Sequence, residues 1–399
     1  MKKIFIYIDS VNGCTLHRLL LPYSEVKKQT DEFTITFGFG NKDLSLQEKL
    51  DIIKDNDIFI FHRLLPNGLL DNIKKQCPNT KLIIDLDDYW RLNDMHPSYQ
   101  LYKEEQVADK IIYHIKNVDY VTCTTEYLAN KIKPFNPNVI ILPNALNPEG
   151  QFEPHPSTSN KLRFGLTGGS SHNKDVQLLE GVVKQLSPDI LNQIQFVLCG
   201  FDKGVYKVTD EKGNVELRDV PWHLNQWTDI EKMLTDNYRT VSPEHKEFLN
   251  QFNWKMEFNS DEPYKRLWTR DVLSYGTIYN EFDVLLVPLI GNDFTACKSE
   301  LKLIEASVMN KPVIVSEVLP YTICGINAIE KGGTINPNGN CIMINNNKGS
   351  KAWVKAITKL VKDVELRNMI ASNLSNLTKQ GVYCLKDLTK ERIKFLQSI

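Results

Sequence analysis

The first 145 residues alternate between short, mostly apolar segments and longer segments with apolar residues at helical spacing. Strands that are apolar on both faces are typical of a parallel sheet covered by helices. The longer segments fit crossover helices between such strands. The predicted strands are 3–8, 33–39, 57–62, 81–86, 120–124 and 139–144, and the predicted helices are 16–29, 44–55, 66–76 and 125–133. The pattern predicts a doubly wound α/β domain.

Residues 147–161 are rich in Pro, Ser, Gly and Asn, which predicts a linker. The alternation then resumes, with strands predicted at 162–168, 194–200, 283–289, 312–317 and 341–346, and helices at 173–186, 299–310 and beyond 346. A length of 399 residues favours two domains. We expect Rossmann-like domains at 1–150 and 151–380, an unassigned insertion at about 201–275, and a C-terminal helix at 381–399 that packs back on the first domain.

Bulk composition narrows the class of protein. The net charge of −1 gives no global basic field, so we expect no stable nucleic-acid partner. No apolar run approaches the ~20 residues of a membrane span, and no signal-peptide pattern follows Met1. The eight cysteines form no C-x-x-C pair, which suits free thiols in a reducing cytoplasm. These features favour a cytoplasmic location; a peripheral membrane contact and the oligomeric state stay open.

Three aspartates, Asp85, Asp87 and Asp88, stand at the end of a predicted strand, with Tyr89 and Trp90 behind them. They fit a metal site, because Asp85-Leu86-Asp87 spells Asp-x-Asp. They also fit a carboxylate pair that handles sugar hydroxyls or a proton, or a turn capped by aspartates.

A second informative stretch runs from 279 to 317, where a buried strand ends at Pro288 and a helix is predicted to open at Lys298 and Ser299. A helix N-terminus beside a lysine and a serine suits a phosphate. Glu305 lies two turns further along this predicted helix and, together with Lys302, can contact a sugar or a ribose. The alternative is an ordinary helix with a serine cap and a Lys-Glu pair.

Polar residues also follow other predicted strands. The stretch "GLTGGSSHNKD" allows close approach of a ligand to the backbone and offers hydrogen bonds from Ser170, Ser171 and His172. In the first domain an Asn12-Gly13 turn leads into a helix with His17 and Arg18, for which a solvated helix face is the alternative. His62 ends another strand, either beside a ligand or half-buried.

The segment "KSELKLIEASVMNKPVIVSE", after "FDVLLVPL", resembles the donor-binding segment of GT-B glycosyltransferases, in particular the large retaining group that uses nucleotide sugars (family 4-like). The resemblance extends to "FGLTGGSSHNKDVQLL" and "TEYLANKIKPFNPNVIILPNAL". It implies two Rossmann-like domains facing a central cleft, with the nucleotide-sugar donor on the second and the acceptor on the first. It also implies no metal and no cofactor besides a UDP- or GDP-sugar.

The resemblance assigns roles to single residues. Glu305 matches the second glutamate of the family's E-x7-E motif, which holds the nucleotide ribose, and Cys297 stands at the position of the first glutamate. Lys174 matches one half of the basic pair that clamps the diphosphate, while Gly169 stands at the arginine position, so Lys298 or Arg270 is the candidate replacement.

The expected site therefore has three parts. The catalytic candidates are Asp87, Asp88, His62 and Lys298. The donor-binding candidates are Gly13, Gly168, Gly169, Ser170, His172, Lys174, Lys298, Ser299, Lys302 and Glu305. The acceptor-side candidates are His17, Arg18, Tyr89, Trp90 and His96. Aromatic rings suit apolar sugar faces, and we interpret the aspartates as cleft carboxylates rather than metal ligands.

The resulting hypothesis is transfer of a sugar from a nucleotide donor to a hydroxyl acceptor, which is a glycan, lipid-linked or other molecule. Three alternatives stay open: a phage-type enzyme that glycosylates modified DNA bases, a GT-B nucleotide-sugar epimerase, and a non-catalytic sugar-binding homologue.

Overall fold

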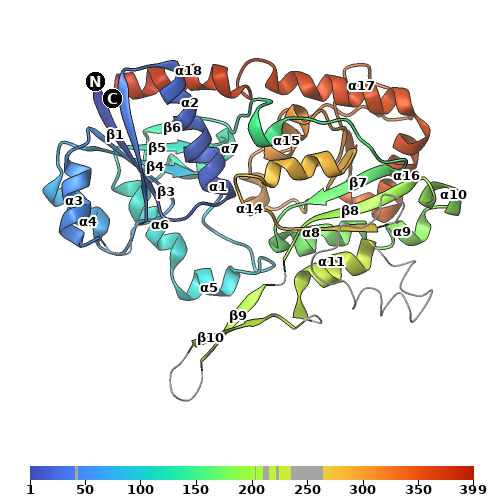
Figure 1. The fold of residues 1–399 in the computed structure, drawn as a ribbon, viewed down its shortest axis with the longest axis horizontal. Coiled ribbons are helices and arrows are strands. Elements are labelled where there is room, and N and C mark those ends of the chain that lie inside the picture. The colour runs from blue at the N-terminus through green and yellow to red at the C-terminus, as the bar shows by residue number, and fades with distance from the viewer. Residues whose placement is uncertain (41–43, 203, 210–214, 222–223, 235–263) are drawn as a thin grey trace. The chain divides into compact units, whose positions relative to one another are not determined.

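The computed structural model describes residues 1–40, 44–202, 204–209, 215–221, 224–234 and 264–399 (Figure 1). The chain divides into two compact units. Unit 1 comprises Met1–Asn147, Gly291–Ile304 and Asn376–Ile399, and unit 2 comprises Pro148–Ile290 and Glu305–Ser375. The segment Gly291–Ile304 was expected in the second domain. It lies in unit 1 because Cys297 packs into that unit's hydrophobic core and Asn144 Nδ2 donates to Ser299 Oγ at 2.8 Å.

Unit 1 is built on a six-stranded parallel sheet in the order β2-β1-β3-β4-β5-β6. Its strands are β1 (Lys2–Ile8), β2 (Phe33–Phe39), β3 (Ile58–His62), β4 (Lys81–Leu86), β5 (Tyr120–Cys123) and β6 (Val139–Ile141). Its helices are α1 (Gly13–Thr15), η1 (Leu16–Leu20), α2 (Leu21–Gln29), α3 (Leu46–Lys54), α4 (Leu69–Gln76), α5 (Tyr99–Glu104), α6 (Val107–Lys116), α7 (Glu126–Ile132), α14 (Asp293–Ala296), η8 (Asn376–Thr378) and α18 (Leu385–Ser398).

The strands of unit 1 are apolar throughout because both faces of the sheet are covered. Phe59 and Phe61 of β3 pack on the face covered by α3, α4, α6 and α7. Ile58 and Ile60 alternate with them and pack on the other face, with α2 and α18. Helix α18 contributes Phe395 to that second core, so the C-terminal helix belongs to unit 1.

Two further helices of unit 1, α5 and α6, were not expected. Apolar residues of α6 at helical spacing, Ile111, Ile112 and Ile115, pack into the core, so its burial pattern is that of an ordinary amphipathic helix. Helix α5 has no buried residue, which leaves little hydrophobic signal to read from the sequence.

A buried ion pair ties β4 to the π-helical segment η1. Arg18 is 1% exposed, and its Nε and Nη2 donate to the two carboxylate oxygens of Asp85 at 2.9 Å each. Arg18 Nη1 donates to the Leu142 carbonyl and to Asn144 Oδ1, and the Thr122 hydroxyl donates to Asp85. These bonds join the ends of three neighbouring strands, β4, β5 and β6, to η1. Arg18 and His17, predicted as acceptor-side residues with a solvated helix face as the alternative, are both buried, since His17 is also only 3% exposed. The solvated helix face is therefore wrong.

Unit 2 has a second six-stranded parallel sheet, in the order β11-β8-β7-β12-β13-β14. Its strands are β7 (Leu162–Thr167), β8 (Ile194–Phe201), β11 (Tyr264–Trp268), β12 (Val284–Val287), β13 (Val313–Ser316) and β14 (Ile342–Ile344), and β9 (Val205–Thr209) pairs with β10 (Val215–Asp219) in a separate hairpin. Its helices are η2 (Gly150–Phe152), η3 (Ser170–His172), α8 (Asn173–Val176), η4 (Gln177–Leu179), α9 (Val182–Gln185), α10 (Pro188–Leu191), α11 (Gln226–Leu234), η6 (Tyr275–Glu281), η7 (Asn346–Lys348), α16 (Ser350–Lys362) and α17 (Val364–Ser375).

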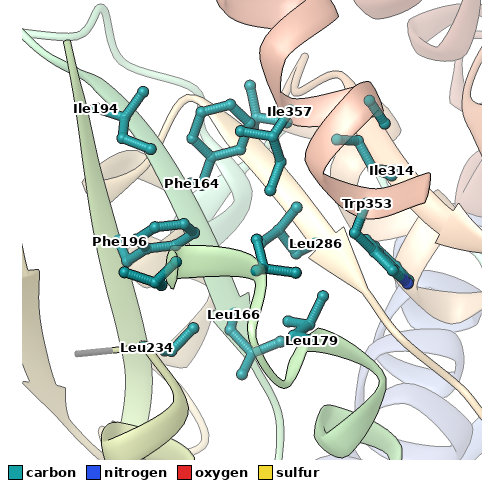
Figure 2. Packing of buried hydrophobic residues seen from close by; sticks show 14 of the residues in the cluster. Phe164, Leu166, Leu179, Ile194, Phe196, Leu234, Leu286, Ile314, Trp353 and Ile357 are labelled. Carbon is teal, nitrogen blue, oxygen red and sulfur yellow. The ribbon is translucent and has the colours of Figure 1, made fainter. Parts of the chain in front are cut away.

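Figure 2 shows the core of unit 2, where Phe164, Phe196 and Leu286 of the sheet face Trp353 and Ile357 of α16. On the opposite face β7 carries Gly165, where an added Cβ would lie 2.2 Å from the Phe282 ring. Glycine at this position lets the aromatic ring pack directly on the strand.

Two predicted helices differ from the structure. The helix expected at 173–186 is broken into α8, η4 and α9, because Gly181 adopts a positive φ of 76° before α9. The helix expected to open at Lys298 starts later, as α15 (Leu301–Val308). It is preceded by α14, which Asn292 and Thr295 cap reciprocally.

The 201–275 segment is described only in part, and the remainder lies outside the described residues. Its last strand, β11, extends the sheet of unit 2 rather than standing outside it. No helix in the described ranges combines the length and the hydrophobicity that a membrane crossing needs.

We expect Asp85→Asn to lower the free energy of unfolding by about 3–5 kcal/mol, because it leaves the buried Arg18 guanidinium without its counter-charge. Urea denaturation measures the loss. The control is Glu391→Gln, which removes an exposed pair with Lys394 and should cost no more than about 1 kcal/mol. Equal losses in both variants would contradict the structural role of the buried pair.

Candidate active site

The carboxyl ends of β3 and β4 place a charged cluster at one edge of the unit 1 sheet. His62 Nε2 lies 2.9 Å from Asp87 Oδ1. Arg63 donates to the same oxygen from Nε at 2.9 Å and from Nη2 at 2.6 Å, and Nη2 also donates to Asp88 Oδ2 at 3.0 Å. Lys298 Nζ lies 3.1 Å from Asp88 Oδ1. The four residues predicted as catalytic thus lie together.

Arg63 joins this cluster, and the sequence prediction missed it as a site residue. Its backbone has a positive φ of 59°, which is unfavourable for a residue with a side chain by about 1–3 kcal/mol. The Arg63 N–H donates to the Asp85 carbonyl at 3.1 Å, which continues the β3–β4 pairing by one residue. The strained turn aims the guanidinium between the two aspartates. The available signal was its place directly after a buried strand.

The charges within the cluster hold Asp87 in its ionised form. Burial raises the pKa of Asp87, but the positive charge of Arg63 and the interaction with His62 outweigh burial and hold this pKa well below its usual range. Cys14 lies beside the cluster, with its Sγ 4.0 Å from Arg63 Nη2. Burial and the neighbouring Asp87 charge raise the pKa of the Cys14 thiol, so this cysteine stays protonated.

Lys298 reaches Asp88 from the loop between α14 and α15. Its ammonium also lies 4.7 Å from the centre of the Phe294 ring. Ser299, beside it, accepts the hydrogen bond from Asn144. In the first loop, Gly13 is exposed and starts α1, and Asn12 caps that helix through Thr15.

The aromatic candidates have different surroundings. Trp90 is 3% exposed and packs edge-on against Phe135 in the core, so it does not offer an open stacking surface as the sequence predicted. Tyr89 is half-buried, packs on Trp90, and has the Lys131 ammonium 5.4 Å from its ring centre. His96 is half-buried and packs edge-on against Phe294.

In unit 2 the predicted donor loop follows the carboxyl end of β7. Gly168 adopts a φ of 159°, Gly169 is exposed, and Ser170 begins η3. His172 Nδ1 lies 2.7 Å from Asp175 Oδ2, and Asp175 Oδ1 accepts the Ile290 N–H, which anchors the loop to the end of β12. Lys174 is exposed and has no ion pair with any residue that the structure describes.

Glu305 is 1% exposed on α15, and its carboxylate accepts hydrogen bonds from the hydroxyls of Tyr275, at 2.5 Å, and Tyr279. Lys302 is half-buried on the same helix. Cys297, expected at the position of the motif's first glutamate, is fully buried and does not face solvent. Arg270 donates to Thr277 and Glu281, which fixes its guanidinium within unit 2.

No group of three or more metal-ligating His, Cys, Asp or Glu side chains occurs in the described part of the chain. The carboxylates of the cluster face Arg63 and Lys298 instead. The arrangement can bind and orient hydroxyl groups and can stabilise charge, since its oxygens and its cations lie side by side.

No known family profile and no curated protein matches the sequence. Solved structures do match over the whole chain. Anabaena HepE, in complex with UDP and glucose, has a TM-score of 0.64 at 12% identity, with 100% of both chains covered. A trehalose-6-phosphate synthase, studied for glycosyl transfer with retention, has a TM-score of 0.58 at 11% identity, with 99% of both chains covered.

An alpha-glucosyltransferase, in complex with UDP-glucose and DNA containing an abasic site, has a TM-score of 0.57 at 12% identity, with 99% of both chains covered. Together with the two six-stranded parallel sheets, these matches show that the chain has the GT-B fold. The fold class predicted from the sequence is confirmed.

The electrostatics of the cluster predict how the loss of stability caused by Asp87→Asn depends on pH. Because the folded-state pKa is depressed, ionised Asp87 stabilises the fold above the unfolded value of about 4, and this contribution is lost as pH falls towards the folded pKa. Asp87→Asn should therefore cost about 1–3 kcal/mol at pH 7 and progressively less below about pH 4.

Urea unfolding of both proteins at a series of pH values measures this difference. The control is Asp94→Asn, which changes an exposed carboxylate and should stay within about 0.5 kcal/mol throughout. A cost of Asp87→Asn that is independent of pH would contradict the charge pairing.

Proposed function

We propose that the protein is a glycosyltransferase that moves a sugar from a nucleotide-sugar donor to a hydroxyl acceptor. The observation that carries the proposal is the cluster of His62, Asp87, Asp88 and Lys298, bridged by Arg63, at the carboxyl edge of a GT-B domain. Open parallel sheets bind ligands at this edge. The solved structures of the same fold that contain UDP or UDP-glucose support a nucleotide sugar as the donor.

In this proposal unit 1 binds the acceptor and unit 2 binds the donor. Asp87 and Asp88 accept hydrogen bonds from sugar or acceptor hydroxyls, and His62, fixed by Asp87, adds a further polar contact. Lys174, exposed beside the Gly168–Gly169 loop, neutralises the donor diphosphate. Glu305 binds the ribose if one of its tyrosine partners gives way to the ligand hydroxyl.

We further propose that the reaction needs no metal ion. A carboxylate pair that already faces a guanidinium and an ammonium is a poor site for a divalent cation, because the fixed positive charges repel it. Stabilisation of the leaving diphosphate then falls to lysines and backbone N–H groups. Retention of configuration is proposed from the similarity to the trehalose-6-phosphate synthase.

The first test is thermal melting with UDP-, GDP-, dTDP-, ADP- and CMP-sugars in the presence of EDTA. A donor that binds the native state raises the melting temperature, and we expect a rise with UDP- or GDP-sugars. Released nucleotide and reaction products are then analysed with and without acceptors, which separates transfer from epimerisation. A rise that requires Mg²⁺ or Mn²⁺ would overturn metal independence, and no rise with any donor would overturn the proposed function.

Lys298→Met tests the role of the cluster in catalysis. Removing a positive charge beside the reacting groups should lower kcat by about 10²–10³-fold. Released nucleotide under saturating donor measures the rate, and melting with the donor shows whether binding is retained. The matched control is Lys331→Met, at an exposed position of unit 2. A Lys298→Met enzyme with the kcat of the control would remove Lys298 from the mechanism.

A further inference from the structure

A pocket of about 630 Å³ lies at the amino-terminal edge of the unit 2 sheet. Its wall includes Leu162, the first residue of β7, as well as Gln193, Asp283 and Pro312, which directly precede β8, β12 and β13. The proposed donor loop follows the carboxyl end of β7, so this pocket lies at the opposite edge of the same sheet. Its volume is in the range of small-molecule sites.

Lys311 in the wall of this pocket is 6% exposed. Among the described residues, none forms an ion pair or a hydrogen bond with its ammonium. Lys311 follows a turn at the end of α15. In this turn Asn310 adopts a left-handed conformation, with φ 53°, and the Lys311 N–H donates to the Ala306 carbonyl at 2.8 Å. A buried ammonium without a counter-charge is costly to maintain.

The other charges of the pocket leave an excess of positive charge. Lys161 and Arg367 line it together with Lys311, and Asp283 is the carboxylate in its wall. That carboxylate is engaged by Arg163, which donates to it from the backbone N–H, Nε and Nη2 at 2.9–3.2 Å. Burial lowers the pKa of both Lys311 and Arg367. The charge of Asp283 partly offsets the effect of burial for both groups, and the charge of Asp363 does so for Arg367.

The rest of the wall is suited to hydroxyl groups. Ser159, Asn160, Asn192, Gln193 and Asn368 offer hydroxyl and amide donors and acceptors around the lysine. An anion with several hydroxyls would supply the missing counter-charge and use these polar groups as well.

We propose that this pocket is a second ligand site, which binds the phosphate ester of a small polyhydroxylated molecule, with the phosphate on Lys311. Lys161 and Arg367 add positive charge around the phosphate, and the amide side chains bind the hydroxyls. The site is separate from the donor loop.

The test is isothermal titration of the full chain with glucose 6-phosphate, glucose and inorganic phosphate, in a phosphate-free buffer of constant ionic strength. We expect glucose 6-phosphate to bind more tightly than inorganic phosphate, and glucose not to bind. Lys311→Met keeps the length of the side chain and removes its charge, so it should weaken glucose 6-phosphate binding by at least about tenfold. Lys331→Met, an exposed control, should bind as the unchanged protein does.

The melting temperature without ligand gives an independent readout. Because Lys311→Met removes an unpaired buried charge, its melting temperature should equal or exceed that of the unchanged protein. Should this variant fail to fold, Lys161→Met, at a half-buried position of the same wall, takes its place in the titration with the same expected direction.

Lys174→Ala separates this site from the proposed donor site, since glucose 6-phosphate should bind this variant as it binds the unchanged protein. Loss of binding in Lys174→Ala with retention in Lys311→Met would assign the phosphate to the donor loop and overturn the proposal. Equal affinity of Lys311→Met and the unchanged protein, or no binding of any probe, would overturn it too.

Discussion

The parallel direction of the strands is the constraint on which the rest of unit 1 depends. Parallel strands place their carboxyl ends at one edge of the sheet. His62, at the end of β3, and Asp87, just after β4, therefore meet there although 25 positions separate them in the sequence. The Arg18–Asp85 pair ties the end of β4 to η1, and Thr122 of β5 donates to the same carboxylate. The site is therefore built on a rigid edge, and its charges need little reorganisation to meet a ligand.

The alternation of cations and carboxylates decides what that edge can do. Asp87 accepts from Arg63 and lies within hydrogen-bond distance of His62, while Asp88 faces Arg63 and Lys298. Each carboxylate keeps acceptor capacity for a hydroxyl because carboxylate oxygens have several lone pairs. Such a surface suits a ligand that has both hydroxyls and negative charge. The hydroxyls can donate hydrogen bonds to the carboxylate oxygens while the negative groups pair with the cations, so that no charged group is left without a partner.

The sequence predicted the parts of the molecule that depend on local pattern. Apolar strands followed by polar residues predicted both sheets and the meeting of His62, Asp87 and Asp88. It could not predict burial that depends on distant partners. The local pattern around His17 and Arg18 fits a solvated helix face as well as a binding site, and Arg18 is buried because Asp85 and Asn144 accept its hydrogen bonds. The positive φ of Arg63 and the closing of the Lys311 pocket by residues from several segments leave no local signature either.

Around α15, the resemblance in sequence does not by itself determine what the matching side chains contact. Its glutamate is retained in Glu305, yet here two tyrosine hydroxyls occupy the carboxylate. At the other end, Cys297 is an apolar core residue whose thiol has a pKa raised by burial to about 12, so it can neither carry charge nor accept strongly. The next residue, Lys298, lies on the cluster through Asp88. A buried thiol is therefore followed here by a lysine, whose positive charge favours binding of anions.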